Sequence, residues 1–130
     1  GEVGAVQREV EERGARVPAL FAGYAPVPAV LHGDLWSGNY AALRDGTPVI
    51  IDPATYYGDR EADLAMTELF GSFGARFYSA YNEAWSLDAG YPVRKTFYNL
   101  YHILNHLNLF GGGYGGQAER MMDRLLAELG

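Results

Sequence analysis

An Asp-Gly pair at positions 45 and 46 lies between two largely apolar runs, residues 40–43 and 48–51. Asp-Gly between such runs is a strong signal of a β-hairpin with a two-residue turn. Pro48 cannot donate a hydrogen bond to a strand partner, so it is expected to begin the second strand or to place that strand at a sheet edge. The sequence therefore predicts a short antiparallel hairpin here.

The turn also predicts which residues of the two strands face each other. Counting outward from a two-residue turn, or from a four-residue loop over 44–47, brings Asn39 opposite Asp52. Directly opposed residues of an antiparallel pair have Cα atoms roughly 4.5–5.5 Å apart. We expect the hairpin to bring these two oxygen-bearing side chains close enough to share a cation.

Asp34 lies in a polar, glycine-containing loop that precedes the hairpin and follows the apolar stretch 27–31. Loops that a buried scaffold holds in place are a usual setting for catalytic residues. Transfer of the terminal phosphate of ATP needs a base that orients the acceptor hydroxyl, and oxygen ligands that hold magnesium. Asp34 can be the base, and Asn39 and Asp52 can be the ligands.

The spacing of His32, Asp34 and Asn39 resembles the catalytic loop of the kinase-like phosphotransferases, which include protein kinases, aminoglycoside phosphotransferases and choline kinases. Within that group the sequence resembles the fructosamine kinase (ketosamine-3-kinase) family most closely, from about Val17 to the C-terminus. The segments that carry the likeness are 32–39, 52–54, 57–65 and 104–108.

The resemblance implies a catalytic base at Asp34, with Asn39 and Asp52 holding Mg²⁺ on the phosphates of the co-substrate ATP. It implies an acceptor that is a ketosamine, small or protein-linked, phosphorylated on a sugar hydroxyl. Trp36 is then a candidate wall of the acceptor site, although it could simply pack on the loop. Two alternatives stay open: a kinase of the same fold for an aminoglycoside, choline or other amino alcohol, and a non-catalytic scaffold.

Two further residues are expected to support the catalytic loop. His32 adjoins the loop and is expected to hold it through hydrogen bonds, with a general-base role as the alternative. Asp63 lies one turn into a helix that Asp59 can cap, and it is expected to brace the loop backbone. The alternative for Asp63 is a surface carboxylate near the positive helix end. Asp59 and Glu61 could instead contact the acceptor, and the sequence does not decide between these roles.

The rest of the chain predicts helices. Residues 3–13 are expected to form the end of a helix that Gly14 closes, and apolar residues recur at helical spacing in four later segments. Those segments run over residues 62–73, 77–85, 93–107 and 121–126. The expected class is α+β, mainly α: the helical C-terminal lobe of a protein-kinase-like phosphotransferase, with a β-hairpin that carries the metal ligands.

No glycine-rich loop precedes the catalytic segment, and the sole lysine, Lys95, lies downstream in a predicted helix. We therefore expect residues 1–130 to form the C-terminal, catalytic and acceptor-binding lobe. The N-terminal nucleotide-binding lobe would lie outside this chain. The isolated segment is then expected to be inactive.

Composition restricts the remaining possibilities. The 130 residues, 48% of them hydrophobic, suffice for one domain with its own core. A net charge of −6 disfavours nonspecific binding to nucleic acid or anionic membranes. Cysteine is absent, and no apolar run approaches the roughly 20 residues of a membrane span. A cytoplasmic protein is expected.

Two other patterns are weaker. His102 and His106 have the spacing of two zinc ligands on a helix, but the accompanying glutamate is missing, so residues that line the acceptor cleft or an interior pair are favoured. The glycine-rich stretch 111–116 lacks the lysine of a phosphate-binding loop and follows a helix, which favours a flexible connector.

Overall fold

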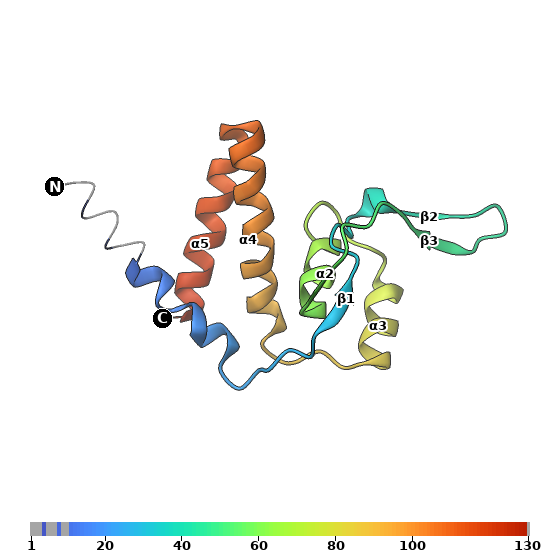
Figure 1. Cartoon of the computed structure of the whole chain (residues 1–130), viewed down its shortest axis with the longest axis horizontal. Helices are drawn as coiled ribbons and strands as arrows, with labels where there is room; N and C mark the ends of the chain where they lie inside the picture. The colour runs from blue at the N-terminus through green and yellow to red at the C-terminus, as the bar shows by residue number, and fades with distance from the viewer. Residues whose placement is uncertain (1–3, 5–7, 9–10, 130) are drawn as a thin grey trace.

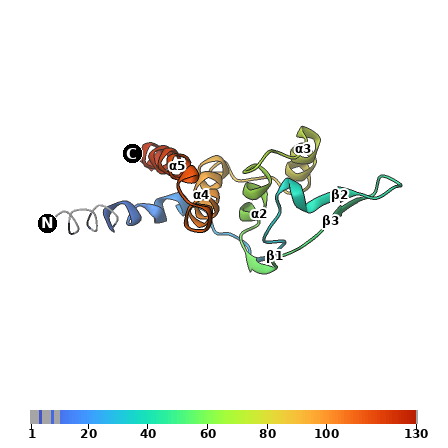
Figure 2. The same ribbon diagram turned by 90° about the horizontal axis from the view of Figure 1, so that it is seen from above.

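The protein is described by a computed structural model, which covers residues 4, 8 and 11–129. Two long helices, α4 (Tyr91–Phe110) and α5 (Gly115–Leu129), lie side by side and antiparallel on one side of the molecule (Figures 1 and 2). The shorter helices α2 (Arg60–Thr67) and α3 (Ala75–Ala84) lie on the other side, together with the strands. The mainly helical class predicted from the sequence is confirmed.

Within the described residues, four short strands form two separate antiparallel pairs. β1 (Ala29–Leu31) pairs with β4 (Tyr56–Gly58), and β2 (Tyr40–Ala42) pairs with β3 (Pro48–Ile50). The β2–β3 hairpin projects away from the body of the molecule (Figures 1 and 2). Pro48 is the first residue of its strand, as a residue without an N–H donor requires.

The hairpin exists, but its predicted register is wrong by one residue. Tyr40 pairs with Ile50, and the Ile51 N–H donates to the Asn39 carbonyl over 2.9 Å, so Asn39 lies opposite Ile51 and not opposite Asp52. The cause is the loop, in which Leu43 N–H donates to the Thr47 carbonyl over 2.9 Å. Three residues, 44–46, therefore lie between Leu43 and Thr47, the pair that closes the loop.

Gly46 explains why the loop has three residues. Its φ is +86°, the left-handed conformation that ends the common three-residue hairpin loop. The Asp45 carboxylate accepts the Thr47 N–H over 2.9 Å, which stabilises the turn further and lowers the pKa of Asp45. An Asp-Gly pair suits this loop as well as the two-residue turn, so the pair alone could not set the register.

Helix α2 begins where its sequence predicts. The Asp59 carboxylate accepts the Glu61 N–H over 3.0 Å and so caps the helix. The helix ends at Thr67, earlier than the apolar stripe to Phe73 predicts. The Thr67 hydroxyl donates to the Leu64 carbonyl over 2.6 Å and takes up an acceptor of the last turn.

Helix α4 packs against α2 and α5, and much of its buried face is polar. Arg94 donates through Nε and Nη2 to the Glu61 carboxylate at 2.7 and 3.0 Å, and their side chains are only 3% and 1% exposed. The apolar stripe predicted for this helix is partly wrong, since Tyr101 is 70% and Leu104 38% exposed. Compared with that prediction, the buried face lies on the side of the helix where Arg94 contacts the Glu61 carboxylate.

The remaining connections are short. The 3-10 segments η1 (Val17–Phe21) and η2 (Ser37–Asn39) flank β1 in sequence, and η3 (Gly112–Tyr114) joins α4 to α5. The glycine-rich stretch is therefore a structured turn, and α5 already begins at Gly115. In the predicted N-terminal helix, residues 4, 8 and 11–14 are helical, and the other positions lie outside the described residues. No described helix is long and apolar enough to cross a membrane.

Candidate active site

The loop of residues 32–39 is held by one carboxylate from α2. Asp63 accepts the His32 N–H at Oδ2 over 2.7 Å and the Gly33 N–H at Oδ1 over 2.9 Å. Both oxygens are used, so the two peptide groups before Asp34 are fixed relative to the helix. Hydrogen bonds to a charged acceptor are among the stronger kind in proteins.

Replacing Asp63 with Ala is expected to lower the free energy of unfolding by about 2–4 kcal/mol, because two backbone donors lose a charged acceptor. Urea denaturation followed by circular dichroism measures the change. Asp123→Ala, at an exposed position of α5, is the matched control and should leave the midpoint nearly unchanged. Equal midpoints for both variants would show that Asp63 does not hold the loop.

His32 ties the same loop to the segment that follows β3. Its Nδ1 accepts the Asp34 N–H over 3.2 Å, so the imidazole is the tautomer whose Nε2 donates to the Ile51 carbonyl over 2.8 Å. The His32 carbonyl accepts the Ala54 N–H over 2.8 Å. Both ring nitrogens are engaged, which fits a structural role better than that of a general base.

Gly33 permits this close approach of the two segments. Its φ is +87°, and a Cβ there would lie 2.0 Å from the Ala54 carbonyl oxygen. Neither the conformation nor the space suits any other residue. The loop can therefore lie directly against the chain after Asp52 only because position 33 is glycine.

Asp34 and Asn39 are in direct contact. The buried Asn39 side chain donates from Nδ2 to the Asp34 carbonyl over 2.8 Å and to Asp34 Oδ2 over 3.1 Å. The amide nitrogen faces Asp34, which leaves Asn39 Oδ1 as the atom that could bind a cation. The short segment η2 between them folds the loop back on itself and makes this contact.

Asp52 is exposed and has a φ of +51°. It is the sole non-glycine residue with a positive φ in the described part of the chain, and such conformations tend to occur at functional sites. No hydrogen bond or ion pair joins Asp52 to Asn39 within the described residues, and none of those residues form a cluster of three or more His, Asp or Glu that could hold a metal. The hairpin as a ready-made metal site is therefore not confirmed.

A cavity of about 410 Å³ opens beside Asp34. Its walls are Trp36, Met66, Phe70 and His106. The Trp36 and Phe70 rings are 6.3 Å apart and nearly perpendicular, and the His106 ring lies 5.2 Å from Phe70. One carboxylate thus faces a mostly aromatic cavity.

Trp36 has two roles in this geometry. Its ring lies over Gly38, where a Cβ would come within 2.3 Å of it, so Trp36 packs on its own loop. The residue is also 39% exposed and lines the cavity. Packing on the loop and lining the cavity, the two roles predicted for Trp36, are therefore compatible.

A second cavity, of about 530 Å³, lies beside Gly33 and is lined in part by Asp59, Tyr98 and His102. Asp59 accepts hydroxyl hydrogen bonds from Tyr24 over 2.9 Å and from Tyr98 over 2.6 Å. Burial, together with these hydrogen bonds, raises the pKa of both tyrosines. Glu61 is paired with Arg94. Asp59 and Glu61, the two carboxylates whose roles the sequence did not decide, therefore both have partners within the protein.

The two histidines of α4 line different cavities. His102 lies in the cavity beside Gly33, where burial lowers its pKa, and His106 lies in the cavity beside Asp34. Their hydrogen bond joins His106 Nδ1 to the backbone carbonyl of His102 over 2.7 Å, so the His102 ring takes no part in it. This arrangement does not suit a shared metal.

Sequence reasoning missed the far wall of the cavity beside Asp34. Met66 and Phe70 follow helical spacing and were expected to be core residues. Met66 is buried at 5% exposure, but Phe70 is 36% exposed because α2 has ended before it. Their position in the cavity wall depends on the end of α2 at Thr67, and no local sequence signal marks that end.

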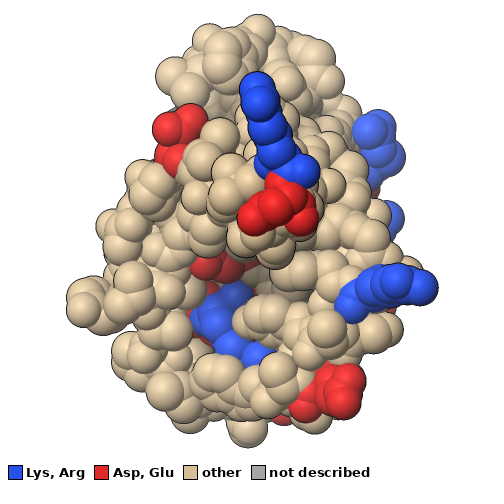
Figure 3. Space-filling view, turned by 90° about the vertical axis from the view of Figure 1, so that its right-hand side faces the viewer, with Lys and Arg blue, Asp and Glu red and all other residues tan. Residues whose placement is uncertain are grey.

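The hairpin beside the site has an apolar surface. Tyr40, Leu43 and Ile50 are 46%, 53% and 60% exposed. The face of the molecule toward which the hairpin points is mostly uncharged (Figure 3). Exposed apolar surface of this kind commonly marks a contact region.

Comparisons with known proteins place these features in a family. A sequence profile of the fructosamine kinase family matches residues 2–128. A probable ketoamine kinase from Synechocystis sp. is 60% identical over 111 residues, which are 85% of this chain and 38% of that protein. A chloroplastic protein-ribulosamine 3-kinase from Arabidopsis thaliana is 49% identical over 110 residues, which are 85% of this chain and 33% of that protein.

A solved structure agrees with the sequence matches. The crystal structure from Thermobifida fusca that is assigned as a fructosamine-3-kinase has a TM-score of 0.80 and 40% identity, over 92% of this chain and 41% of that one. The chain thus spans less than half the length of the relatives it matches. On these sequence and structural matches, the chain belongs to the fructosamine kinase family.

Proposed function

We propose that these residues form the catalytic and acceptor-binding part of an ATP-dependent kinase that phosphorylates a sugar hydroxyl of a ketosamine. The observation that carries the proposal is the placement of Asp34, held by Asn39 and by the Asp63-braced loop, at an aromatic-walled cavity. The names of the relatives, ketoamine kinase and protein-ribulosamine 3-kinase, support a fructosamine or ribulosamine as acceptor.

Asp34 is the proposed base. One of its oxygens accepts a hydrogen bond from Asn39, which fixes the carboxylate while it faces the cavity. An acceptor hydroxyl bound there could donate its proton to Asp34 as it attacks the phosphate. Such a residue contributes mainly by orienting the nucleophile for in-line attack.

Asn39 Oδ1 and the Asp52 carboxylate are the proposed ligands of Mg²⁺. Magnesium is commonly held by one or two carboxylates together with waters and substrate phosphates, so one amide oxygen and one exposed carboxylate fit its chemistry. When bound, the ion would neutralise charge on the phosphates. The positive φ of Asp52 supports this role, because it turns the residue out of the strand direction set by β3.

The cavity beside Asp34 suits the proposed acceptor. Trp36 and Phe70 offer aromatic faces to the apolar side of a sugar ring. A ketosamine also carries an amine that is protonated near neutral pH, and aromatic faces attract such a cation. Its amine and its hydroxyls could therefore be recognised by the same small set of side chains.

The residues that bind the nucleotide are proposed to lie outside this chain. The sole lysine, Lys95, lies in α4 and contacts Glu68 at 3.4 Å, so it is not placed as the phosphate-pairing lysine of a kinase. The matched relatives are more than twice as long as the matched segment. We infer that the isolated chain is inactive. The cytoplasmic location expected from the sequence stays a prediction.

An acceptor panel tests the proposal. The full-length protein that contains this chain, incubated with labelled ATP and Mg²⁺, is expected to phosphorylate fructosamines or ribulosamines at least about tenfold faster than choline or an aminoglycoside, since a mismatched acceptor loses oriented contacts. The Asp34→Asn variant controls for contaminating kinases. Preference for choline or an aminoglycoside would select the alternative acceptor class, and no transfer to any acceptor would favour a non-catalytic scaffold.

A further inference from the structure

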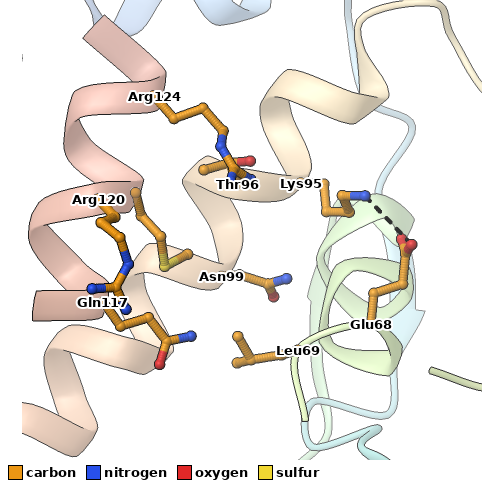
Figure 4. Close-up of a pocket in the computed structure, with 9 residues that line it drawn as sticks. Glu68, Leu69, Lys95, Thr96, Asn99, Gln117, Arg120 and Arg124 are labelled. Carbon is orange, nitrogen blue, oxygen red and sulfur yellow. Dashed lines mark hydrogen bonds and ion pairs between the residues drawn. The ribbon is translucent and has the colours of Figure 1, made fainter. Parts of the chain in front are cut away.

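We propose that a third pocket, separate from the two cavities beside the catalytic loop, binds a small sugar phosphate. This α4–α5 pocket, of about 430 Å³, is lined by Glu68 at the end of α2, by Lys95 and Asn99 of α4, and by Arg120 and Arg124 of α5 (Figure 4). Its volume is in the range of small-molecule sites. It shares no lining residue with either cavity beside the catalytic loop.

The charge of the α4–α5 pocket favours an anion. Lys95, Arg120 and Arg124 supply three positive charges against one from Glu68, in a chain whose net charge is −6. Lys95 contacts Glu68 at 3.4 Å, whereas neither arginine forms an ion pair with any carboxylate of the described residues. Arg120 and Arg124 lie one helical turn apart, so both can reach one bound group.

Both arginines line the pocket from α5. Figure 4 shows Arg124 extending from α5 toward Thr96 of α4, and Arg120 running along α5 with its guanidinium beside Gln117. A guanidinium binds phosphate through two parallel hydrogen bonds, and two guanidiniums on one face can share a phosphate group. The two cationic side chains therefore favour a phosphate on the α5 side of the pocket.

Asn99 contributes a buried acceptor to the lining of the pocket. The residue is only 6% exposed, and its Nδ2 donates to the Ala65 carbonyl over 2.8 Å. Its Oδ1 is the one buried side-chain polar atom without a hydrogen-bond partner in the described part of the chain. An unpaired buried acceptor is costly, so the site calls for a donor.

A sugar phosphate satisfies both requirements together. Its phosphate can bind Arg120 and Arg124, and a ring hydroxyl can donate to Asn99 Oδ1. Inorganic phosphate would meet only the first requirement, and an uncharged sugar only the second. The carboxylate of Glu68 accepts the Tyr91 hydroxyl over 2.6 Å and contacts Lys95 at 3.4 Å, and it keeps lone pairs that could accept a sugar hydroxyl.

Calorimetric titration of the full-length protein with ribose 5-phosphate tests this inference, with inorganic phosphate and ribose as separate probes. Ribose 5-phosphate is expected to bind at least about tenfold more tightly than either part alone, because it alone meets both groups. The Arg120→Gln/Arg124→Gln variant should lose at least about tenfold in affinity. Asn99→Leu should remove the preference over inorganic phosphate.

Controls separate this pocket from other anion sites. Arg44→Gln/Arg76→Gln, which changes two exposed arginines outside the pocket, should bind as the wild type does. Saturating ATP with Mg²⁺ should leave the affinity unchanged. Loss of binding in the presence of ATP, or unaltered binding by the α5 double variant, would overturn the proposal. The α5 variant changes only exposed residues, so the test does not depend on whether Asn99→Leu folds.

Discussion

Asp34→Asn in the full-length protein is expected to lower kcat by about 10²–10⁴-fold, the usual contribution of a positioned general base. Asparagine keeps an oxygen where Asp34 Oδ2 now accepts the hydrogen bond from Asn39, so the loop should keep its shape. The acceptor hydroxyl would lose the group that takes its proton. KM for the acceptor should change little, because the walls of the cavity remain in place.

Steady-state kinetics with the preferred acceptor measure this effect, and thermal unfolding checks that the variant is folded. Asp45→Asn is the matched control, since Asp45 is an exposed aspartate of the nearby hairpin loop. Turnover close to that of the wild type would remove Asp34 from the mechanism. A loss of activity shared by Asp45→Asn would point to damage of the hairpin.

Arg94→Met is expected to lower the free energy of unfolding by about 3–5 kcal/mol, the usual effect of leaving one partner of a buried ion pair alone. Glu61, only 1% exposed, would lose both hydrogen bonds from the guanidinium. Arg94 also donates to the Leu20 carbonyl over 3.1 Å, so η1 should loosen against α4. Urea denaturation gives the magnitude.

Two further measurements separate lost charge pairing from lost packing. The variant Glu61→Met/Arg94→Met should be more stable than Arg94→Met alone, because it removes the stranded charge. Arg94 also holds the pKa of Asp88 below its usual value through a hydrogen bond of 2.8 Å. That pKa, followed by NMR, should rise in Arg94→Met. If the single variant is as stable as the wild type, the pair does not organise the core.

The sequence could predict the parts of the fold that depend on local chemistry. The hairpin, the Asp59 cap of α2 and the contact of Asp63 with the loop follow from turn residues, capping and helical spacing. The hairpin register could not be predicted, because Asp45-Gly46 suits loops of two and three residues alike. One residue of loop length decides whether Asp52 or Ile51 lies opposite Asn39.

Local sequence patterns also could not predict features that depend on partners distant in sequence. The buried face of α4 carries Arg94 and Asn99 because Glu61 and the Ala65 carbonyl of α2 lie opposite them. Apolar periodicity instead favoured a face that includes Tyr101. For the same reason helical spacing assigns Phe70 to the core, whereas its exposure depends on where α2 ends.

The contact between Gly33 and Ala54 bears on how mutational tolerance around this site should be interpreted. A random library would be expected to lose function at position 33 as severely as at Asp34, because any side chain would meet the Ala54 carbonyl and would have to adopt a φ of +87°. Gly33 has no side chain that could take part in a reaction. Intolerance to substitution in this loop therefore indicates a catalytic role only at positions where a different side chain would fit without a clash.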